Sequence, residues 1–290
     1  MMKLKTFIGL AFAGLMFASS AHAYILSAGD VKFTFDTYSK GHAGYNSPAN
    51  GTLCSTVAEC DAVDTDLTND GYGGDVWGIF SIAAIQNTST GVTTWVRGQD
   101  GQYLTGIYGG LQDAKIEKAF AGSANEFQIS NMTGGWMEMY WNTADYDPTL
   151  TPAGRTAEKE FTGINSADLA LSAIFDGATN GGDPYPYVAS TFIKSVQGSG
   201  SGYMDVIGGD MADWLDTNAM IDTAGTGRDL FFGIKYDDAN FNASENGWTV
   251  LGTGDVKGQV ETPTVAEPGT LALMGLGLLG LGAAVRRKIK

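Results

Sequence analysis

The chain has 290 residues, with 17 basic and 32 acidic side chains and a net charge of −15. Repulsion between this negative charge and phosphate groups argues against nucleic acids and anionic membrane surfaces as partners, whereas divalent cations would be attracted. The length is sufficient for one large β domain or two small ones.

The first 23 residues have the three parts of a signal peptide. Lys3 and Lys5 begin it, an apolar run covers residues 7–18, and an A-x-A triplet ends it at Ala23. The apolar run is shorter than the roughly 20 residues of an ordinary membrane span. We therefore predict export by the Sec machinery and cleavage by signal peptidase before Tyr24; a buried N-terminal helix is the alternative.

Residues 24–260 are predicted to form a secreted domain made mainly of β-strands. Over residues 31–36, apolar and charged or polar side chains alternate, which is typical of a half-buried strand. A hairpin is predicted for residues 77–85 and 92–96, because polar turn residues separate these two apolar runs. Further strands are predicted at residues 136–141, 203–207, 230–236 and 248–251, and the last of these could close the sheet.

Two short helices are expected between these strands. Ser166 is a candidate N-cap for a helix over residues 167–175, and residues 211–215 could make one helical turn. Short strands, many aromatic residues and 41 glycines favour an antiparallel β-sandwich over a barrel or an α/β fold. A short C-terminal hydrophobic helix would follow this domain.

The only two cysteines, Cys54 and Cys60, lie six residues apart. Because an exported protein meets an oxidising compartment, we predict that they form a disulfide that closes a local loop. Such a short loop should contribute about 2 kcal/mol to stability. A metal or redox pair is the alternative, but no further Cys or His ligand lies nearby in the sequence.

An acidic, glycine-containing loop follows the second cysteine. Ca²⁺ prefers six to eight oxygen ligands, and the spacing of Asp66, Asp70 and Gly71 is like the start of an EF-hand. Trp77 occupies the position of the bidentate glutamate, which argues against an EF-hand. A different kind of calcium loop remains a candidate, with a solvated acidic loop as the alternative. The candidate ligands are Asp61, Asp64, Asp66, Asp70 and Asp75.

The sequence offers little support for catalysis. Once the signal peptide is removed, His42 is the only histidine, and there is no G-x-S-x-G motif before a helix. These absences argue against Ser-His and Cys-His hydrolases. Glu138, between Trp136 and Tyr140 on one strand face, is a candidate acid for a carboxylate-dependent glycosidase. A chance placement in an acidic chain is the alternative.

The C-terminus joins an apolar segment to a basic end. Residues 261–270 are a predicted linker, and residues 271–285 are apolar apart from glycines. As a helix the apolar segment would extend only about 22 Å, less than the roughly 30 Å of a hydrocarbon core. The basic tail, residues 286–290, would remain on the cytoplasmic side. Its charged residues are Arg286, Arg287, Lys288 and Lys290.

A Pro-Glu-Pro-like tripeptide at residues 266–268, the apolar segment and the basic cluster together resemble the PEP-CTERM sorting signal. The matching motif residues are Glu267, Pro268, Gly269 and Thr270, and Ala266 stands where the family usually has its first proline. The resemblance implies recognition by an exosortase, a membrane-bound cysteine transpeptidase-like enzyme, in the envelope of a Gram-negative-type cell. A permanent anchor without processing is the alternative.

A second, glycine-rich stretch covers residues 198–209, 216–218 and 229–232. It resembles a pattern found in many PEP-CTERM ectodomains, some of them associated with flocculation and exopolysaccharide. We therefore expect a non-catalytic surface or matrix protein linked to exopolysaccharide, flocculation or biofilm, with no cofactor other than a possible Ca²⁺. A Ca²⁺-dependent carbohydrate-binding module and a carboxylate-dependent glycosidase are the alternatives.

Overall fold

The computed structural model describes residues 26–41, 49–63, 72–147, 149–175, 184–194, 197–236 and 246–261. The predicted signal peptide, nearly all of the linker, the apolar segment and the basic tail lie outside these residues. Within the described part of the chain, no helix is both long and apolar enough to cross a membrane.

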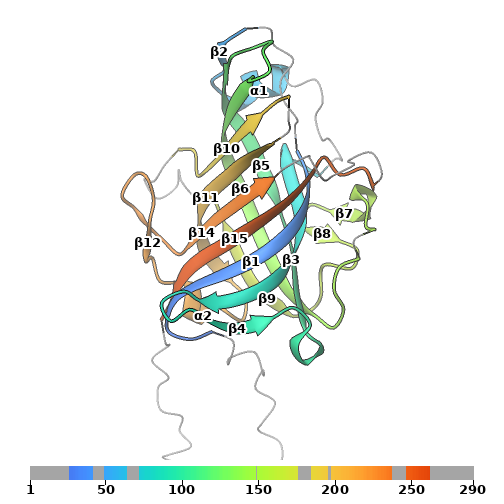
Figure 1. The fold of residues 1–290 in the computed structure, drawn as a ribbon, viewed down its shortest axis with the longest axis vertical. Coiled ribbons are helices and arrows are strands. Elements are labelled where there is room, and N and C mark those ends of the chain that lie inside the picture. The colour runs from blue at the N-terminus through green and yellow to red at the C-terminus, as the bar shows by residue number, and fades with distance from the viewer. Residues whose placement is uncertain are drawn as a thin grey trace, which may run out of the picture.

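One antiparallel sheet dominates the described residues (Figure 1). Its strands are β1 (Gly29–Lys40), β2 (Gly51–Cys54), β3 (Val76–Asn87), β4 (Val92–Val96), β5 (Tyr103–Ala119), β6 (Phe127–Asn142), β9 (Leu169–Ile174), β10 (Tyr187–Phe192), β11 (Gln197–Gly208), β14 (Leu230–Tyr236) and β15 (Val250–Val260). Two small hairpins are formed by β7 (Arg155–Ala157) with β8 (Glu160–Phe161) and by β12 (Met220–Ile221) with β13 (Gly227–Arg228). The helices are α1 (Val57–Val63) and α2 (Ala212–Leu215), with 3-10 turns at Gln99–Gly101 and Pro152–Gly154.

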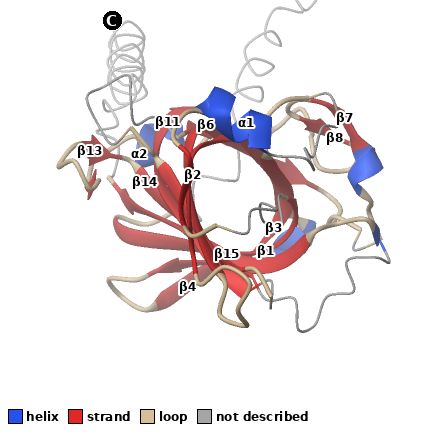
Figure 2. Cartoon of the chain, turned by 90° about the horizontal axis from the view of Figure 1, so that it is seen from above, coloured by secondary structure: helices blue, strands red, loops and turns tan. Residues whose placement is uncertain are grey.

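The sheet closes on itself, so the predicted sandwich is corrected to a closed barrel. Starting from β1, the pairing runs through β3, β5 and β6 on one side and through β15, β14 and β11 on the other. Both β9 and β10 bridge β6 to β11, with β10 toward the α1 end and β9 toward the α2 end (Figure 1), and so they share one of eight positions around the ring. Figure 2 shows the closed ring from above. Since β5 pairs with both β3 and β6, and β9 joins β6 to β11, the ring of strands is continuous and does not separate into two layers.

The apolar core fills much of the barrel interior. On β1, Val31, Phe33 and Phe35 point inward and are at most 3% exposed. The ring of Phe35 lies 5.3 Å from that of Phe80 and 5.4 Å from that of Phe232, measured between centroids. Burying such side chains stabilises the fold by roughly 1.5–3 kcal/mol each.

Inward-facing glycines make room for the aromatic rings. Gly198, Gly200 and Gly202 alternate with serines along β11. A Cβ atom on Gly200 would lie 1.9 Å from the hydroxyl oxygen of Tyr187, and one on Gly198 would lie 2.5 Å from that of Tyr236. The glycines are therefore on the inner face of a strand because no larger side chain fits there.

A second apolar cluster lies outside the wall, beneath the β7–β8 hairpin, which Figure 2 shows beside the ring. Trp77 and Trp248 contact edge to face with centroids 5.2 Å apart, and the guanidinium of Arg155 lies 4.6 Å from the Trp77 ring. The covering segment thus gives β3, β5 and β6 a buried outer face. This explains why the sequence of β3 is apolar almost throughout.

Most predicted strands are confirmed, but one predicted helix is wrong. The helix predicted for residues 167–175 is instead strand β9 (Leu169–Ile174), which pairs with both β6 and β11. Its short apolar run fits a strand buried on both faces as well as a helix, and the available partners decide between them. The predicted strands lie in β1 (31–36), β6 (136–141), β11 (203–207) and β14 (230–236). The predicted hairpin is β3 with β4, and the predicted turn at 211–215 is α2. The strand predicted at 248–251 begins at Val250 and closes the barrel as β15.

Candidate binding site

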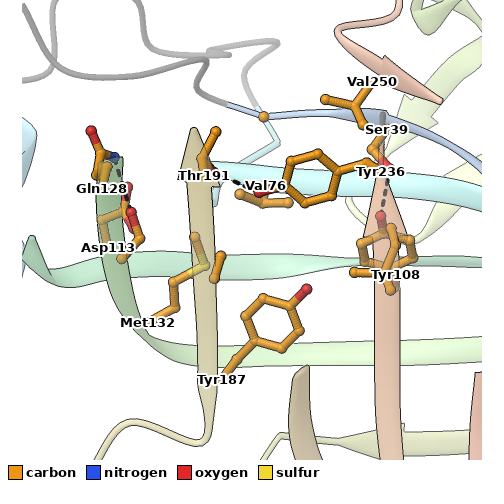
Figure 3. Close-up of a pocket in the computed structure, with 14 residues that line it drawn as sticks. Ser39, Val76, Tyr108, Asp113, Gln128, Met132, Tyr187, Thr191, Tyr236 and Val250 are labelled. Atoms are coloured by element: carbon orange, nitrogen blue, oxygen red, sulfur yellow. Dashed lines mark hydrogen bonds between the residues drawn. The ribbon is translucent and has the colours of Figure 1, made fainter. Parts of the chain in front are cut away.

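A cavity of about 70 Å³ lies inside the barrel, toward the end that carries α1 (Figure 3). Seven strands contribute to its wall, so its shape depends on the closure of the barrel. The side chains that line it are Ser39, Val76, Tyr108, Asp113, Gln128, Ser130, Met132, Tyr187, Ala189, Thr191, Ile234, Tyr236 and Val250.

The inner face becomes polar toward this cavity. Along β1 the inward positions change from phenylalanine to Thr37 and then Ser39, which are 0% and 5% exposed. The Ser39 hydroxyl lies 2.6 Å from the Tyr108 hydroxyl, and Gln128 Nε2 donates to Ser130 Oγ at 3.1 Å. Hydrogen bonds among the lining groups therefore offset much of the cost of burying them.

Three phenols surround the cavity, and all three are neutral near pH 7. Burial raises the pKa values of Tyr108, Tyr187 and Tyr236 above the ordinary tyrosine value. The Tyr236 hydroxyl lies 2.5 Å from the Thr191 hydroxyl and donates to the Ser190 carbonyl at 3.2 Å. These phenols can therefore donate and accept hydrogen bonds, and their rings remain uncharged.

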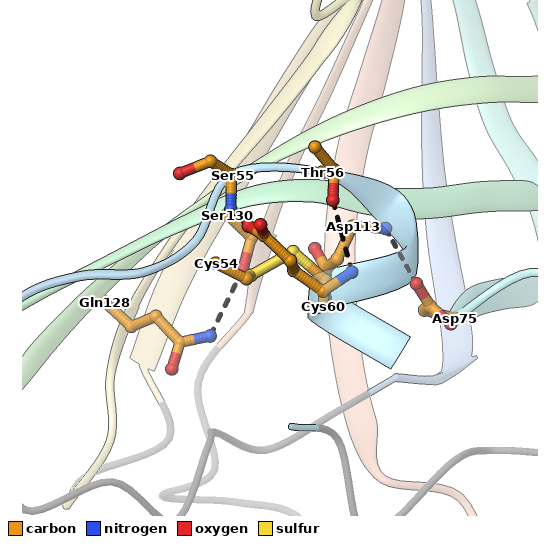
Figure 4. The surroundings of a disulfide bond; sticks show 9 residues. Cys54, Ser55, Thr56, Cys60, Asp75, Asp113, Gln128 and Ser130 are labelled. Carbon is orange, nitrogen blue, oxygen red and sulfur yellow. Dashed lines mark hydrogen bonds between the residues drawn. A yellow bond between two sulfur atoms is a disulfide. The ribbon is translucent and has the colours of Figure 1, made fainter. Parts of the chain in front are cut away.

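A pair of buried aspartates stands at the cavity wall. Asp113 and Asp75 are 1% and 7% exposed. The Asp113 amide donates to Asp75 Oδ2 at 2.7 Å, and the Asp75 amide donates to the Leu111 carbonyl at 2.7 Å (Figure 4). These bonds fix the course of β5 beside the start of β3.

The predicted disulfide is present near the same end of the barrel. Cys54 at the end of β2 is bonded to Cys60 in α1, which is fully buried (Figure 4). Both cysteines pack against Ile116 of β5. The bond therefore holds α1 and β2 on the protruding part of β5, and not within the barrel wall.

The structure describes two of the five predicted calcium ligands, Asp61 and Asp75. Asp64, Asp66 and Asp70 lie outside the described residues, as does His42. Asp61 is exposed on α1, whereas Asp75 is buried and engaged by the Asp113 amide. Across the described ranges, no group of three or more His, Cys, Asp or Glu side chains could hold a metal ion. A calcium site therefore stays a prediction.

Glu138, the candidate glycosidase acid, lies on the outer wall and not in the cavity. Its carboxylate accepts from the Tyr140 hydroxyl at 2.5 Å and pairs with Lys159 Nζ at 3.1 Å. The flanking rings of Trp136 and Tyr140 are only 6% and 8% exposed. The ion pair and the burial favour a structural role in attaching the β7–β8 hairpin.

An open groove crosses the outer face of β11, β14 and β15. Two hollows, of about 600 and 340 Å³, share Ser199, Lys235 and Thr253. In the sheet register these three residues form one row across the strands, and Ser190 of β10 extends it. Gly233 in the next row has no side chain, which deepens the second hollow. The groove thus presents hydroxyl groups and the ammonium group of Lys235 to solvent, and the second hollow adds Lys257, which pairs with Asp255 at 3.4 Å.

Sequence reasoning named neither the groove nor the cavity, apart from Asp75 beside the cavity wall. A signal for the cavity does exist: Thr37 and Ser39 continue the inward positions of an otherwise apolar β1. No comparable signal identifies which residues of β10 and β14 meet them, because that depends on the register of the closed sheet.

Comparison with known proteins finds one match. Residues 264–288 match the family model for the PEP-CTERM protein-sorting motif. This match contains Glu267, Pro268, Gly269 and Thr270 and the basic residues Arg286, Arg287 and Lys288, all outside the described residues. Neither a curated protein nor a solved structure is detectably similar to the chain.

Proposed function

We propose that the chain is a non-catalytic surface or matrix protein of a Gram-negative-type cell. It carries a PEP-CTERM protein-sorting motif, which indicates an exported protein sorted to the cell envelope by an exosortase. In this proposal it associates with exopolysaccharide and contributes to flocculation or biofilm structure. The sorting motif is the observation on which the proposal rests.

Two features of the folded domain support a non-catalytic role. The one acid that the sequence singles out, Glu138, is held by Lys159 and Tyr140 beneath a hairpin. The barrel itself is a closed scaffold, and a disulfide fixes α1 and β2 beside it, which suits a protein that persists outside the cell. Glycoside hydrolysis needs two acids at a suitable separation; Glu160 lines the same outer hollow as Glu138, but Glu138 is already engaged by Lys159 and Tyr140.

Deletion of the gene tests the proposal. We expect the deletion strain to aggregate less and to retain less surface polymer, and complementation to restore both properties. Intact mass of the protein recovered from envelope and medium should show that residues 1–23 are absent and that the chain ends before the basic tail. Unchanged aggregation and polymer retention would count against the matrix role, whereas a full-length cytosolic product would count against the whole proposal.

The outer groove favours carbohydrate binding as a second candidate function. Strands lie about 4.8 Å apart, so the row of Ser190, Ser199, Lys235 and Thr253 offers polar groups at regular intervals across the wall. A polymer with repeating hydroxyl groups would match this spacing better than a compact molecule would.

A glycan array probed with the exported chain tests this candidate. We expect binding that Ser199→Leu weakens at least fivefold, because the leucine fills the middle of the groove. The matched control, Thr93→Leu, lies on the edge strand β4, away from the groove. Retention of binding by chelator-treated protein would remove the Ca²⁺ requirement but not the function; no glycan signal in either condition would remove the function.

A further inference from the structure

We propose that the cavity inside the barrel binds a small organic ammonium ion, with the Asp113 carboxylate and the surrounding tyrosine rings as its recognition groups. This inference concerns the interior of the barrel. It does not depend on the matrix function, on the outer groove or on the sorting motif.

The lining of the cavity is unusually polar for a barrel interior. An apolar side chain at each inward position would complete the core at no desolvation cost, as Phe33 and Phe35 do farther along β1. Instead, Ser39, Gln128 and Ser130 occupy inward positions that are at least 94% buried. Departures from a simple apolar core concentrate where a protein has a site.

The lining of the cavity is acidic. Asp113 is the one charged side chain among the described residues that line the cavity. Asp75 adds a second carboxylate next to it through the Asp113 amide. Any negative charge on this pair repels anions and attracts cations more strongly in a poorly solvated site than it would in water. The chain without its two terminal signals has 11 basic and 31 acidic residues, which raises the local concentration of cations further.

Three tyrosine rings form part of the cavity wall. Tyr108, Tyr187 and Tyr236, from three different strands, line the same cavity as Asp113. In Figure 3 they lie on one side of Thr191 and Met132, and Asp113 lies on the other side, next to Gln128. The faces of neutral tyrosine rings attract organic cations, and burial strengthens that attraction. The hydroxyl groups of Ser39 and Thr191 lie beside these rings and can accept hydrogen bonds from an ammonium group.

The volume of the cavity limits the size of the ligand. One water molecule needs about 10–15 Å³ of such space, so a cavity of about 70 Å³ has room for about five water-sized groups. This volume excludes a sugar ring or a lipid chain as the whole ligand. It suits a primary ammonium ion with a short alkyl chain.

An NMR titration of the exported chain tests the proposal. Propylammonium and 1-propanol have the same number of non-hydrogen atoms but differ in charge, and acetate supplies the opposite charge. We expect propylammonium to shift the amide signals of Tyr108 and Asp113 with a Kd at least tenfold below that of 1-propanol, and acetate to cause no shift. Equal Kd values for the amine and the alcohol, binding of acetate, or no response to any of the three would overturn the proposal.

Variants separate recognition from folding. Asp113→Asn should bring the two Kd values within twofold of each other, whereas Asp100→Asn, an equal charge change in an exposed turn, should preserve the tenfold preference. If Asp113→Asn does not fold, Ala189→Leu provides the second test, because the leucine fills the cavity and should abolish binding of propylammonium. Undiminished binding to that variant, or a response to Ca²⁺ with none to propylammonium, would refute the assignment.

Discussion

Replacement of Gly200 by alanine tests whether the inner face of β11 must lack a side chain at this position. The new methyl group would lie 1.9 Å from the Tyr187 hydroxyl oxygen and 2.6 Å from its Cζ atom. Tyr187 is 4% exposed, and its ring lies 5.4 Å from that of Phe175 and 6.2 Å from that of Phe232. The ring therefore cannot move aside without displacing other core side chains.

The expected cost follows from two opposing effects. Overpacking of a filled interior costs about 1–3 kcal/mol, and the loss of backbone freedom in the unfolded chain returns about 0.4–1 kcal/mol. We expect Gly200→Ala to lower the free energy of unfolding by about 1–2 kcal/mol. For a domain of this size, that corresponds to a fall in Tm of about 2–8 °C.

Urea and thermal unfolding of the oxidised protein provide the measurement. Gly208→Ala is the matched control, since Gly208 is on the same strand and an added Cβ would meet nothing within 4 Å. That control should be neutral or slightly stabilising. In a Tyr187→Phe background, Gly200→Ala should cost less, because the nearest atom is gone. Equal stability of the two alanine variants would refute the packing explanation.

Three other predictions concern the outer parts of the structure. Replacing Cys54 and Cys60 by serine should lower the free energy of unfolding by about 2 kcal/mol and leave the β-sheet circular dichroism intact, since the bond closes a loop beside the barrel; loss of that signal would contradict this. Burial alone would raise the pKa of Asp222, but hydrogen bonds from the Thr226 and Ala224 amides and from Arg228 outweigh burial and lower the pKa. Asp222 therefore stabilises the fold above its unfolded pKa of about 3.8, and the advantage of the wild type over Asp222→Asn in urea should shrink as the pH falls through and below that value; a pH-independent difference would speak against it. Glu138→Gln should cost about 0.5–1 kcal/mol, as expected for a partly exposed ion pair, when measured by thermal unfolding; a much larger loss would indicate that the hairpin depends on this pair.

The positions of strands could be predicted from the sequence because side-chain alternation is a local property. In β1, the alternation that begins at Val31 identifies both the strand and its buried face. The same reasoning is ambiguous for β9, where six residues lie between two partner strands and are mostly buried. Their helical and extended patterns differ too little over such a length.

The closure of the sheet could not be predicted, because it depends on pairing between distant segments. Gly29 of β1 lies opposite Val260 of β15, at the other end of the domain. The glycines of β11 and β15 that admit large rings look like turn residues in the sequence, which favoured a sandwich with many turns. The cavity has the same origin, since Asp113, Thr191 and Tyr236 meet only when the ring of strands is complete.

The last strand also determines how the domain would respond to mechanical load. The sorting motif begins four residues after Val260, where β15 ends. β15 is paired at eleven positions with β1 and at seven with β14, and both neighbours run antiparallel to it. Tension at this point that is opposed at the far end of the barrel would load these ladder bonds in shear, many at once, and would not peel them apart one after another. A domain attached through its C-terminus would therefore resist extraction by flow or by the pull of neighbouring cells.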